Sequence, residues 1–569
     1  MKKIIETTAK YASLIIASFN ALIFFAMRIC WSGISKTLGY EKNYAKIIFD
    51  LPVLVMVLFV IVAILSIVNF LLNKKKPVLS YILLGVSFLF LIVIIAIFIL
   101  GAMEYSLYIF RNFAKSLGYL LLIGIAIFFI FFYHKTPLKD SKPFKITLIS
   151  IISLASVCSL LKVTINYITY EPVVYAVENE YQIVFSSSSN SMGSVKIGDK
   201  EYYDLFSGSE KSFTKVHKVC VPMSELNNAK EYTISVQHPI YRGPFGALLG
   251  REITKTYSFI PCDKSDGIKY FTISDVHLNF KRAVQTASYV ENMDFLVLGG
   301  DLTSYVQNEE DANFANKIAF AITKGEKPVI YTRGNHEIKG EYAEQLYKYV
   351  GSKDQKFFYT FYLDGVYGLN LDIGEDHDDD WWEYYTTAHF DEYRNEQLSL
   401  LDEELLKQDY LSYDYRLLTC HIPLPFVNYR KNHEDFKSKA VAKLNNMKID
   451  MHVSGHQHQL YVFDPNKVTP NTKLTYNPEF KKGTYNGYLL NFNFPSLMVS
   501  KTGFNQKDSN YLVNAKSIIG LETYVDLNNH QQICTYKNSK GEKVNVVNPF
   551  AKINYGDSIE IDLLTKEMK

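Results

Sequence analysis

Several features are absent or scarce in this sequence of 569 residues, and these absences narrow what the protein can be. Beyond residue 169 there is no Asn-x-Ser/Thr acceptor for glycosylation, which favours a bacterial surface over a eukaryotic secretory route. The same part is poor in basic residues, since residues 170–569 contain 43 Lys and Arg against 53 Asp and Glu. Phosphate backbones are held by Lys and Arg, so nucleic acid is not expected as a partner.

Cysteine is also rare, with six residues in the whole chain. Cys30 and Cys158 lie in apolar stretches, and the other four lie beyond residue 169. Cys220 and Cys262 flank a β-rich segment, and they would be able to pair in an oxidising compartment. Two free buried thiols explain these positions equally well, so the sequence leaves both possibilities open.

The N-terminal region has the opposite character, because residues 1–169 contain 17 Lys and Arg but only 5 Asp and Glu. A helix needs about 20 apolar residues to cross the hydrocarbon core of a membrane. No cleavage site of small residues follows the first apolar stretch, so a signal peptide is not expected. The region is predicted to be an all-α membrane region of about five transmembrane helices, at 11–34, 51–73, 77–103, 116–133 and 146–161.

The basic loops predict the orientation of these spans. Lysines cluster at 2–10, 74–76 and 135–145, and five spans would place all three clusters on one side. Basic loops are retained in the cytoplasm, which would put the rest of the chain outside. The lysines between residues 36 and 46 lie on the other side and count against this orientation. We therefore expect a multi-pass protein of the cell membrane with its C-terminal part extracytoplasmic.

Residues 170–264 have the pattern of a small β-rich domain. Segments such as "YQIVF" and "YTISVQ" alternate or carry β-branched and aromatic residues, and clusters of Ser, Gly and Asn separate them. They predict an antiparallel β-sandwich, with a boundary in the polar turn "CDKSDG" at 262–267.

From Gly267 onward, short apolar runs end in polar signatures, and helical stretches such as 311–323 and 392–408 lie between some of them. Strands that alternate with helices predict a layered α/β domain, at 265–569, with further strands at its C-terminal end. Reactive groups in such domains gather at the carboxyl ends of strands. The signatures are "YFTISDVH", "DFLVLGGD", "PVIYTRGNHE", "RLLTCHIP" and "IDMHVSGHQH".

These signatures supply only nitrogen and oxygen ligands. Such a set suits two divalent ions, Mn, Fe or Zn, better than a structural thiolate zinc site. A single Asp after a strand is usually turn chemistry, but the complete ordered set is specific. Gly455 is expected to give the last turn clearance. The candidate residues are Asp275, His277, Asp301, Asn335, His336, His421, His456 and His458.

The series D-x-H, G-D, G-N-H-E, a lone H after a strand, and G-H-x-H resembles the calcineurin-like metallophosphoesterase superfamily, over about residues 268–500. The resemblance implies a four-layer αββα sandwich with a two-metal centre. It also implies that Asp301 bridges the two metals and that His336 is the acid that assists the leaving group. The remaining ligands would be Asp275, His277 and His458 for one metal, and Asn335, His421 and His456 for the other.

Residues 170–264 look like the fibronectin-type module that precedes the metal domain of purple acid phosphatases, and "FPSLMVS" is similar to a stretch of that group. The pattern departs at His277, where purple acid phosphatases have glycine. We therefore expect His277 to be a ligand, in place of the tyrosine that gives those enzymes their chromophore.

Together these features predict a membrane-anchored dinuclear-metal phosphoesterase. It would hydrolyse phosphate mono- or diesters outside the cytoplasm by attack of a metal-bridging hydroxide. Its partners would be a phosphate ester substrate and, through the spans, membrane lipid. Two alternatives stay open, namely a metal-binding sensor or surface-binding module without turnover, and a lipid-phosphate hydrolase that uses the membrane region.

Two further features have open interpretations. Glu337 would either orient His336 or a ligand, or face solvent. The acidic and aromatic insertion "GEDHDDDWWEYY" at 374–385 would form either a lid over the site or a solvated loop with its aromatic side chains packed inward.

Overall fold

In the computed structural model, the chain forms two compact units. One comprises Met1–Ala155 with Trp382–Tyr385, and the other comprises Ser156–Trp381 with Thr386–Lys569. The structure describes residues 11–20, 61–68, 79–80, 82–90, 167–206, 208–243, 246–381, 384, 387–428, 433–458, 460–471, 473–476, 485–500, 518–548 and 553–569.

The N-terminal unit is helical at residues 11–20, 61–68, 79–80 and 82–90. Its buried contacts include a cluster of Ala17, Val62, Ala63 and Leu83. None of the helices in the described part of the chain has both the length and the hydropathy of a membrane span. Two of the expected spans, 116–133 and 146–161, lie outside the described residues, as do parts of the other three. The five-span region therefore stays a prediction.

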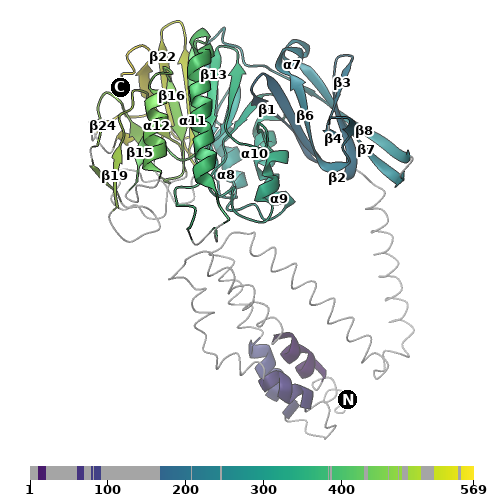
Figure 1. Cartoon of the computed structure of the whole chain (residues 1–569). Helices are drawn as coiled ribbons and strands as arrows, with labels where there is room; N and C mark the ends of the chain where they lie inside the picture. The colour runs from purple at the N-terminus through teal and green to yellow at the C-terminus, as the bar shows by residue number, and fades with distance from the viewer. Residues whose placement is uncertain are drawn as a thin grey trace. The chain divides into compact units, whose positions relative to one another are not determined.

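The C-terminal unit is built on a twelve-stranded sheet (Figure 1). Four neighbouring strands, β9, β10, β11 and β1, run parallel, and the strands outside them pair antiparallel. Its strands are β25 (Ile559–Asp562), β22 (Gln531–Lys537), β21 (Gly520–Asp526), β9 (Ile268–Ile273), β10 (Phe295–Leu298), β11 (Pro328–Tyr331), β1 (Ile168–Val177), β2 (Glu180–Ile197), β7 (Glu231–Gly243) and β8 (Gly246–Ser258), with β3 (Lys200–Tyr203) and β6 (Thr214–Pro222) also paired to β2.

A second sheet of six strands has β13, β14, β16 and β20 parallel at its centre. Its strands are β12 (Tyr359–Leu363), β13 (Val366–Leu371), β14 (Tyr415–Cys420), β16 (Met451–Ser454), β20 (Ser496–Met498) and β17 (Val462–Phe463). Small sheets add β15 (Phe426–Val427), β19 (Tyr485–Leu489), β18 (Lys473–Tyr476), β23 (Val547–Asn548), β24 (Ile553–Asn554), β4 (Leu205–Phe206) and β5 (Glu210–Lys211).

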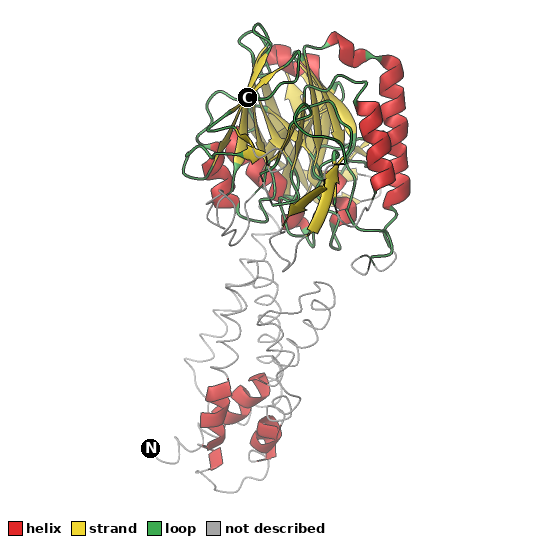
Figure 2. Cartoon of the chain, turned by 90° about the vertical axis from the view of Figure 1, so that its left-hand side faces the viewer, coloured by secondary structure: helices red, strands yellow, loops and turns green. Residues whose placement is uncertain are grey.

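Helices cover the outer faces of the two large sheets (Figures 1 and 2). Buried residues of α8 and α10 pack on the first sheet, and those of α11 and α12 pack on the second. The helices are α7 (Met223–Ala229), α8 (Phe280–Ala287), α9 (Glu309–Ala312), α10 (Phe314–Thr323), η3 (Ala343–Lys348), α11 (Phe390–Lys407), η4 (Asp409–Ser412) and α12 (Glu434–Leu444).

Alternation along the central strands produces the layers. In β10, Phe295 and Val297 lie in the core between the sheets, whereas Leu296 and Leu298 face the α8/α10 side. Successive side chains of a strand point to opposite faces, so a strand that is apolar throughout must be covered on both faces. The order of layers is therefore helix, sheet, sheet, helix, which is the α/β arrangement that the sequence predicted.

The segment 170–264 is continuous with the first sheet. Strand β1 pairs in parallel with β11, which lies beyond the predicted boundary, and β2 extends the sheet into β6 and β7. The predicted boundary near residue 265 thus lies within one sheet of a single compact unit, and it stays a prediction. Cys220 and Cys262 are both free thiols, so the possible disulfide between them is not formed.

Candidate metal centre

The candidate ligands follow the carboxyl ends of five central strands. Asp275 and His277 follow β9, Asp301 follows β10, and Asn335 follows β11. In the second sheet, His421 directly follows β14, and His456 and His458 follow β16. Parallel neighbours end at the same edge of a sheet, so each sheet presents its polar residues at one edge. The expected placement of the signatures after strands is confirmed.

Backbone hydrogen bonds join these turns. The Asp275 amide donates to the Gly300 carbonyl at 3.0 Å, and the His277 amide donates to the Asp301 carbonyl at 3.0 Å. In the second sheet, the Gly455 amide donates to the His421 carbonyl at 2.8 Å. Each turn therefore fixes the position of the next, although long stretches of sequence separate them.

Five of the eight candidate residues have left-handed backbone conformations, which non-glycine residues rarely adopt. Their φ angles are 53° for Asp275, 42° for His277, 51° for Asp301, 74° for His456 and 52° for His458. Such residues persist only where surrounding interactions determine the conformation, and they cluster at functional sites. Positive φ also occurs at other non-glycine residues of the described chain, such as Lys230 and Gln408, so this conformation accompanies the ligand pattern without identifying it.

Two groups of ligand atoms form around Asp301. In the first, one ligand atom from each of Asp275, His277, Asp301 and His458 lies within 4.8 Å of the others. The second group contains Asp301, His421 and His456 under the same limit. Asn335 joins this second group, because its Oδ1 lies 3.1 Å from His456 Nδ1.

The protonation of these groups shows why they fit a cation. His421 Nδ1 lies 2.7 Å from the Gly299 carbonyl oxygen, so it carries the hydrogen and leaves Nε2 as an acceptor in the neutral ring. That Nε2 is buried without a hydrogen-bond partner and lies 3.2 Å from Asp301 Oδ2. Two acceptors that face each other in a buried site repel unless a proton or a metal ion lies near both.

The nitrogen atoms of His277 and His458 give a second example. The two Nε2 atoms lie 3.1 Å apart, and His458 Nε2 also lies 3.3 Å from Asp275 Oδ1. Without an ion, only protons can relieve this crowding of lone pairs.

Burial opposes the charged form of His421, but the Asp301 carboxylate raises the pKa of His421 to about 10. Burial also opposes ionisation of Asp301, yet the neighbouring histidines hold the pKa of Asp301 well below its usual value.

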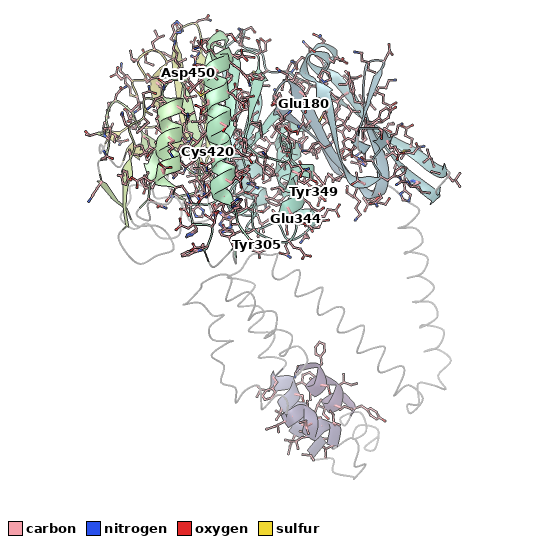
Figure 3. All side chains as sticks on the ribbon, viewed as in Figure 1. Glu180, Tyr305, Glu344, Tyr349, Cys420 and Asp450 are labelled. Carbon is pink, nitrogen blue, oxygen red and sulfur yellow. The ribbon has the colours of Figure 1, made fainter. Side chains whose placement is uncertain are left out.

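His336 lies at the rim of the site, with 34% of its side chain exposed. Its Nδ1 lies 2.8 Å from the Ser304 carbonyl oxygen and therefore carries a hydrogen. Its Nε2 lies 3.8 Å from Asp301 Oδ2, so the second nitrogen faces the metal centre. Figure 3 labels Tyr305, the next residue along this loop. In the neutral ring Nε2 is therefore an acceptor, and His336 can donate a proton from Nε2 only when both nitrogens are protonated, a form that burial disfavours by lowering the pKa of His336.

Glu337 is buried and does not face solvent. Its carboxylate accepts hydrogen bonds from the amides of Asp301, Thr303 and Gly334, at 2.8, 3.0 and 2.9 Å. Burial and the charge of Asp301 raise the pKa of Glu337. Of the two interpretations of Glu337, the structure supports the one in which Glu337 orients a ligand, because its carboxylate holds the turn that contains Asp301.

The insertion that begins at Gly374 reaches the site, and its contacts with two candidate ligands were not predicted from the sequence. Glu375 is 1% exposed and accepts hydrogen bonds from Asn335 Nδ2 at 3.2 and 3.1 Å. Asp376 Oδ2 lies 3.1 Å from His456 Nε2. The acidic start of this segment is therefore not a solvated loop, whereas His377 and Trp381 do stack, with ring centroids 4.2 Å apart.

Gly455 gives the last turn the expected clearance. A Cβ at this position would lie 2.2 Å from Ser274 Oγ and 2.6 Å from Asp275 Oδ2. Gly334 has the same role in the turn after β11, where a Cβ would lie 2.2 Å from the Asp301 amide nitrogen. Any side chain at either position would displace a candidate ligand.

Residues 268–460 match a protein-family model described as Calcineurin-like phosphoesterase. The match covers less than half of the chain, but it contains all five strand ends and all eight candidate residues. No curated protein sequence matches the chain significantly.

Several solved structures resemble the chain at low sequence identity. A purple acid phosphatase, PPD1 from yellow lupin (Lupinus luteus) seeds, is 13% identical with a TM-score of 0.43, covering 69% of this chain and 76% of its own. PhoD is 10% identical with a TM-score of 0.39, covering 72% and 91%. GAP50, the anchor in the inner membrane complex of Plasmodium, is 13% identical with a TM-score of 0.30, covering 52% and 89%. These TM-scores are too low to support a functional argument, so the purple acid phosphatase layout stays a prediction.

Proposed function

We propose that this chain, which contains a calcineurin-like metallophosphoesterase domain and is a metal-dependent phosphoester hydrolase, cleaves phosphate mono- or diesters at a membrane surface outside the cytoplasm. The observation that supports this proposal best is the set of acceptor atoms that face one another around Asp301. Only cations satisfy such a set without protonating it.

In this proposal, Asp301 would help to hold two divalent ions, Mn, Fe or Zn. Asp275, His277 and His458 would hold one ion with it, and Asn335, His421 and His456 would hold the other. The donors are carboxylate, amide and imidazole groups, which bind hard or borderline divalent ions. When bound, such a pair supplies charge neutralisation for phosphoryl oxygens and lowers the pKa of water toward 7.

The chain's own residues then provide orientation and proton transfer. Glu337 holds the Asp301 turn through three amides, which keeps the shared carboxylate in place. The Ser304 carbonyl holds His336 so that its Nε2 faces the site. From there the imidazolium form of His336, protonated at both nitrogens, donates its Nε2 proton to the leaving oxygen and returns to the neutral ring, a step that contributes about 10²–10⁴ in rate.

Membrane anchoring is supported by the distribution of side chains in the N-terminal unit. Ile15, Ile82 and Leu89 are 53%, 56% and 58% exposed, whereas Ser13 and Asn20 are fully buried. Asn20 Nδ2 donates a hydrogen bond to the Ser87 carbonyl at 2.7 Å. Apolar side chains outside and small or polar ones inside are typical of helices that face lipid.

The activity is tested with purified full-length protein, Mn²⁺ or Zn²⁺, and a panel of an aryl phosphate monoester, an aryl diester and a glycerophospholipid. We expect turnover of at least one aryl substrate and its loss in Asp301→Asn and His421→Ala. Asp380→Asn, an exposed carboxylate, is the matched control. Unchanged rates in the first two variants would contradict the site, and metal uptake without turnover of any substrate would favour a sensor.

Membrane anchoring and the orientation of the chain are tested separately. We expect the chain to resist alkaline extraction from membranes. We also expect protease added outside intact cells to cleave the C-terminal unit. Release of the full-length chain by alkali would contradict anchoring, and protection of the C-terminal unit would contradict the orientation. A preference for the glycerophospholipid over soluble esters would favour the lipid-phosphate alternative.

A further inference from the structure

Two adjacent acidic residues, Glu375 and Asp376, contact two different candidate ligands of the same metal. They follow β13 and belong to the insertion that the ligand pattern does not include. Glu375 contacts Asn335, and Asp376 contacts His456. Neither residue belongs to the two groups of ligand atoms around Asp301, so their role is a separate question.

Glu375 determines which way the Asn335 amide points. An ionised carboxylate has only acceptors, so the amide must turn its NH₂ group toward Glu375. Lys339 Nζ lies 3.1 Å from Glu375 Oε2, which keeps this buried carboxylate ionised and paired. With its nitrogen held by Glu375, Asn335 presents Oδ1 to the metal centre, where it lies 3.1 Å from His456 Nδ1.

Asp376 determines the tautomer of His456 by the same reasoning. Its Oδ2 lies 3.1 Å from His456 Nε2 and also accepts a hydrogen bond from Asn428 Nδ2 at 2.9 Å. A carboxylate next to Nε2 keeps the hydrogen of the neutral ring on that nitrogen. The lone pair of His456 is then on Nδ1, which faces Asn335 Oδ1.

We propose that Glu375 and Asp376 are positioning residues that orient Asn335 Oδ1 and His456 Nδ1 toward one metal position. They would thereby raise the metal affinity of that position and not of the other. This inference rests on the proposed two-metal function. Outer carboxylates of this kind fix the ring orientation of ligating histidines, and their loss typically weakens metal binding 10–100-fold. The contacts that link Glu375 and Asp376 to candidate ligands go to Asn335 and His456, whereas Asp275, His277 and His458 form the other metal position.

The test compares metal binding in Glu375→Gln and Asp376→Asn with that in the wild type. Both substitutions keep the size of the side chain and remove its charge. Calorimetric titration of the metal-free, full-length protein with Mn²⁺ measures both affinities, and electron paramagnetic resonance of Mn²⁺ distinguishes a coupled pair from a single ion. Asp378→Asn, an exposed carboxylate in the same segment, is the control.

We expect two Mn²⁺ ions in the wild type and the control. In each variant, one ion should bind about 10–100-fold more weakly while the other keeps its affinity, so that the single-ion signal grows at intermediate Mn²⁺. The weakening should be confined to one ion whatever the melting temperature of the metal-free variants, because a purely structural role would weaken both ions together.

Three results would overturn the proposal. The first is wild-type affinity for both ions in both variants. The second is equal weakening of both ions together with a lower metal-free melting temperature, which would make the segment structural. The third is loss of a third ion, because one ligand atom each of Glu375, Asp376 and His377 also lie within 4.8 Å of one another. A wild type that binds fewer than two ions would instead contradict the proposed function itself.

Discussion

Substitution of Glu337 tests whether the strained turn at Asp301 depends on a buried carboxylate. Asp301 has a φ of 51°, and its amide donates to Glu337 Oε2 at 2.8 Å. The Gly334 amide donates to the same oxygen at 2.9 Å, and the Thr303 amide donates to Oε1 at 3.0 Å. One buried side chain, 2% exposed, therefore accepts three backbone hydrogen bonds.

The magnitudes follow from these three bonds. In Glu337→Gln, the remaining oxygen can take the place of Oε2 and keep two bonds, but the NH₂ group then faces the Thr303 amide. Loss of one hydrogen bond to a charged group costs about 1.5–3 kcal/mol, which corresponds to about 10–150-fold in an opening equilibrium. Glu337→Ala leaves all three amides without an acceptor, at about 1–3 kcal/mol for each buried group.

Hydrogen–deuterium exchange with mass spectrometry measures this effect locally. Peptides that cover residues 299–304 should exchange about 10–150-fold faster in Glu337→Gln and faster still in Glu337→Ala. Glu344→Gln, whose exposed side chain is labelled in Figure 3, should leave the same peptides unchanged. Equal exchange rates in wild type and both Glu337 variants would refute the idea that this carboxylate holds the turn.

Three further predictions concern the same site. Gly455→Ala places a Cβ 2.6 Å from Asp275 Oδ2, so it should lower the free energy of unfolding by about 1–3 kcal/mol and weaken Mn²⁺ binding in a calorimetric titration. Wild-type Mn²⁺ binding in this variant would show that the turn does not need glycine. His336→Gln should lower kcat about 10²–10⁴-fold for alkyl phosphates, and much less for nitrophenyl phosphate, whose leaving group needs little protonation, and equal losses on both substrates would argue against an acid role. In metal-free protein, burial opposes the charged form of His421, but Asp301 raises the pKa of His421 to about 10. The contribution of this ion pair to the free energy of unfolding is therefore complete below pH 6.5 and is lost as the pH rises toward 10. Mn²⁺ competes with the same proton, so the melting temperature without metal should fall over this range while Mn²⁺ affinity rises, and a flat metal-free profile would contradict the assignment.

The strands and helices that carry the site could be predicted from the sequence. The expected helices at 311–323 and 392–408 correspond to α10 (Phe314–Thr323) and α11 (Phe390–Lys407). The apolar runs "YFTI" and "FLVL" correspond to β9 and β10, where burial on both faces makes the pattern continuous. These elements were predictable because periodicity and turn residues act over a few neighbouring positions.

The supporting residues could not be found in this way. Glu375 and Asn335 are 40 positions apart, and Asp376 and His456 are 80 positions apart. Nothing local distinguishes Glu375 from the exposed Asp378 and Asp380 of the same acidic run. Packing of α11 helps to fix the segment, through Arg394, whose guanidinium donates to the carbonyls of Ile373 and Glu375 at 2.9 Å.

The sequence by itself determined the identity and order of the candidate ligands, because each lies within a few residues of the end of a strand and each carries its own turn signature. Tertiary structure alone decided that segment 170–264 shares a sheet with the metal-binding half, through the pairing of β1 with β11. It also decided which carboxylates face the ligands and which face water. The physical reason is that sheet pairing and buried ion pairing depend on contacts between distant segments, and these contacts leave no periodic pattern along the chain.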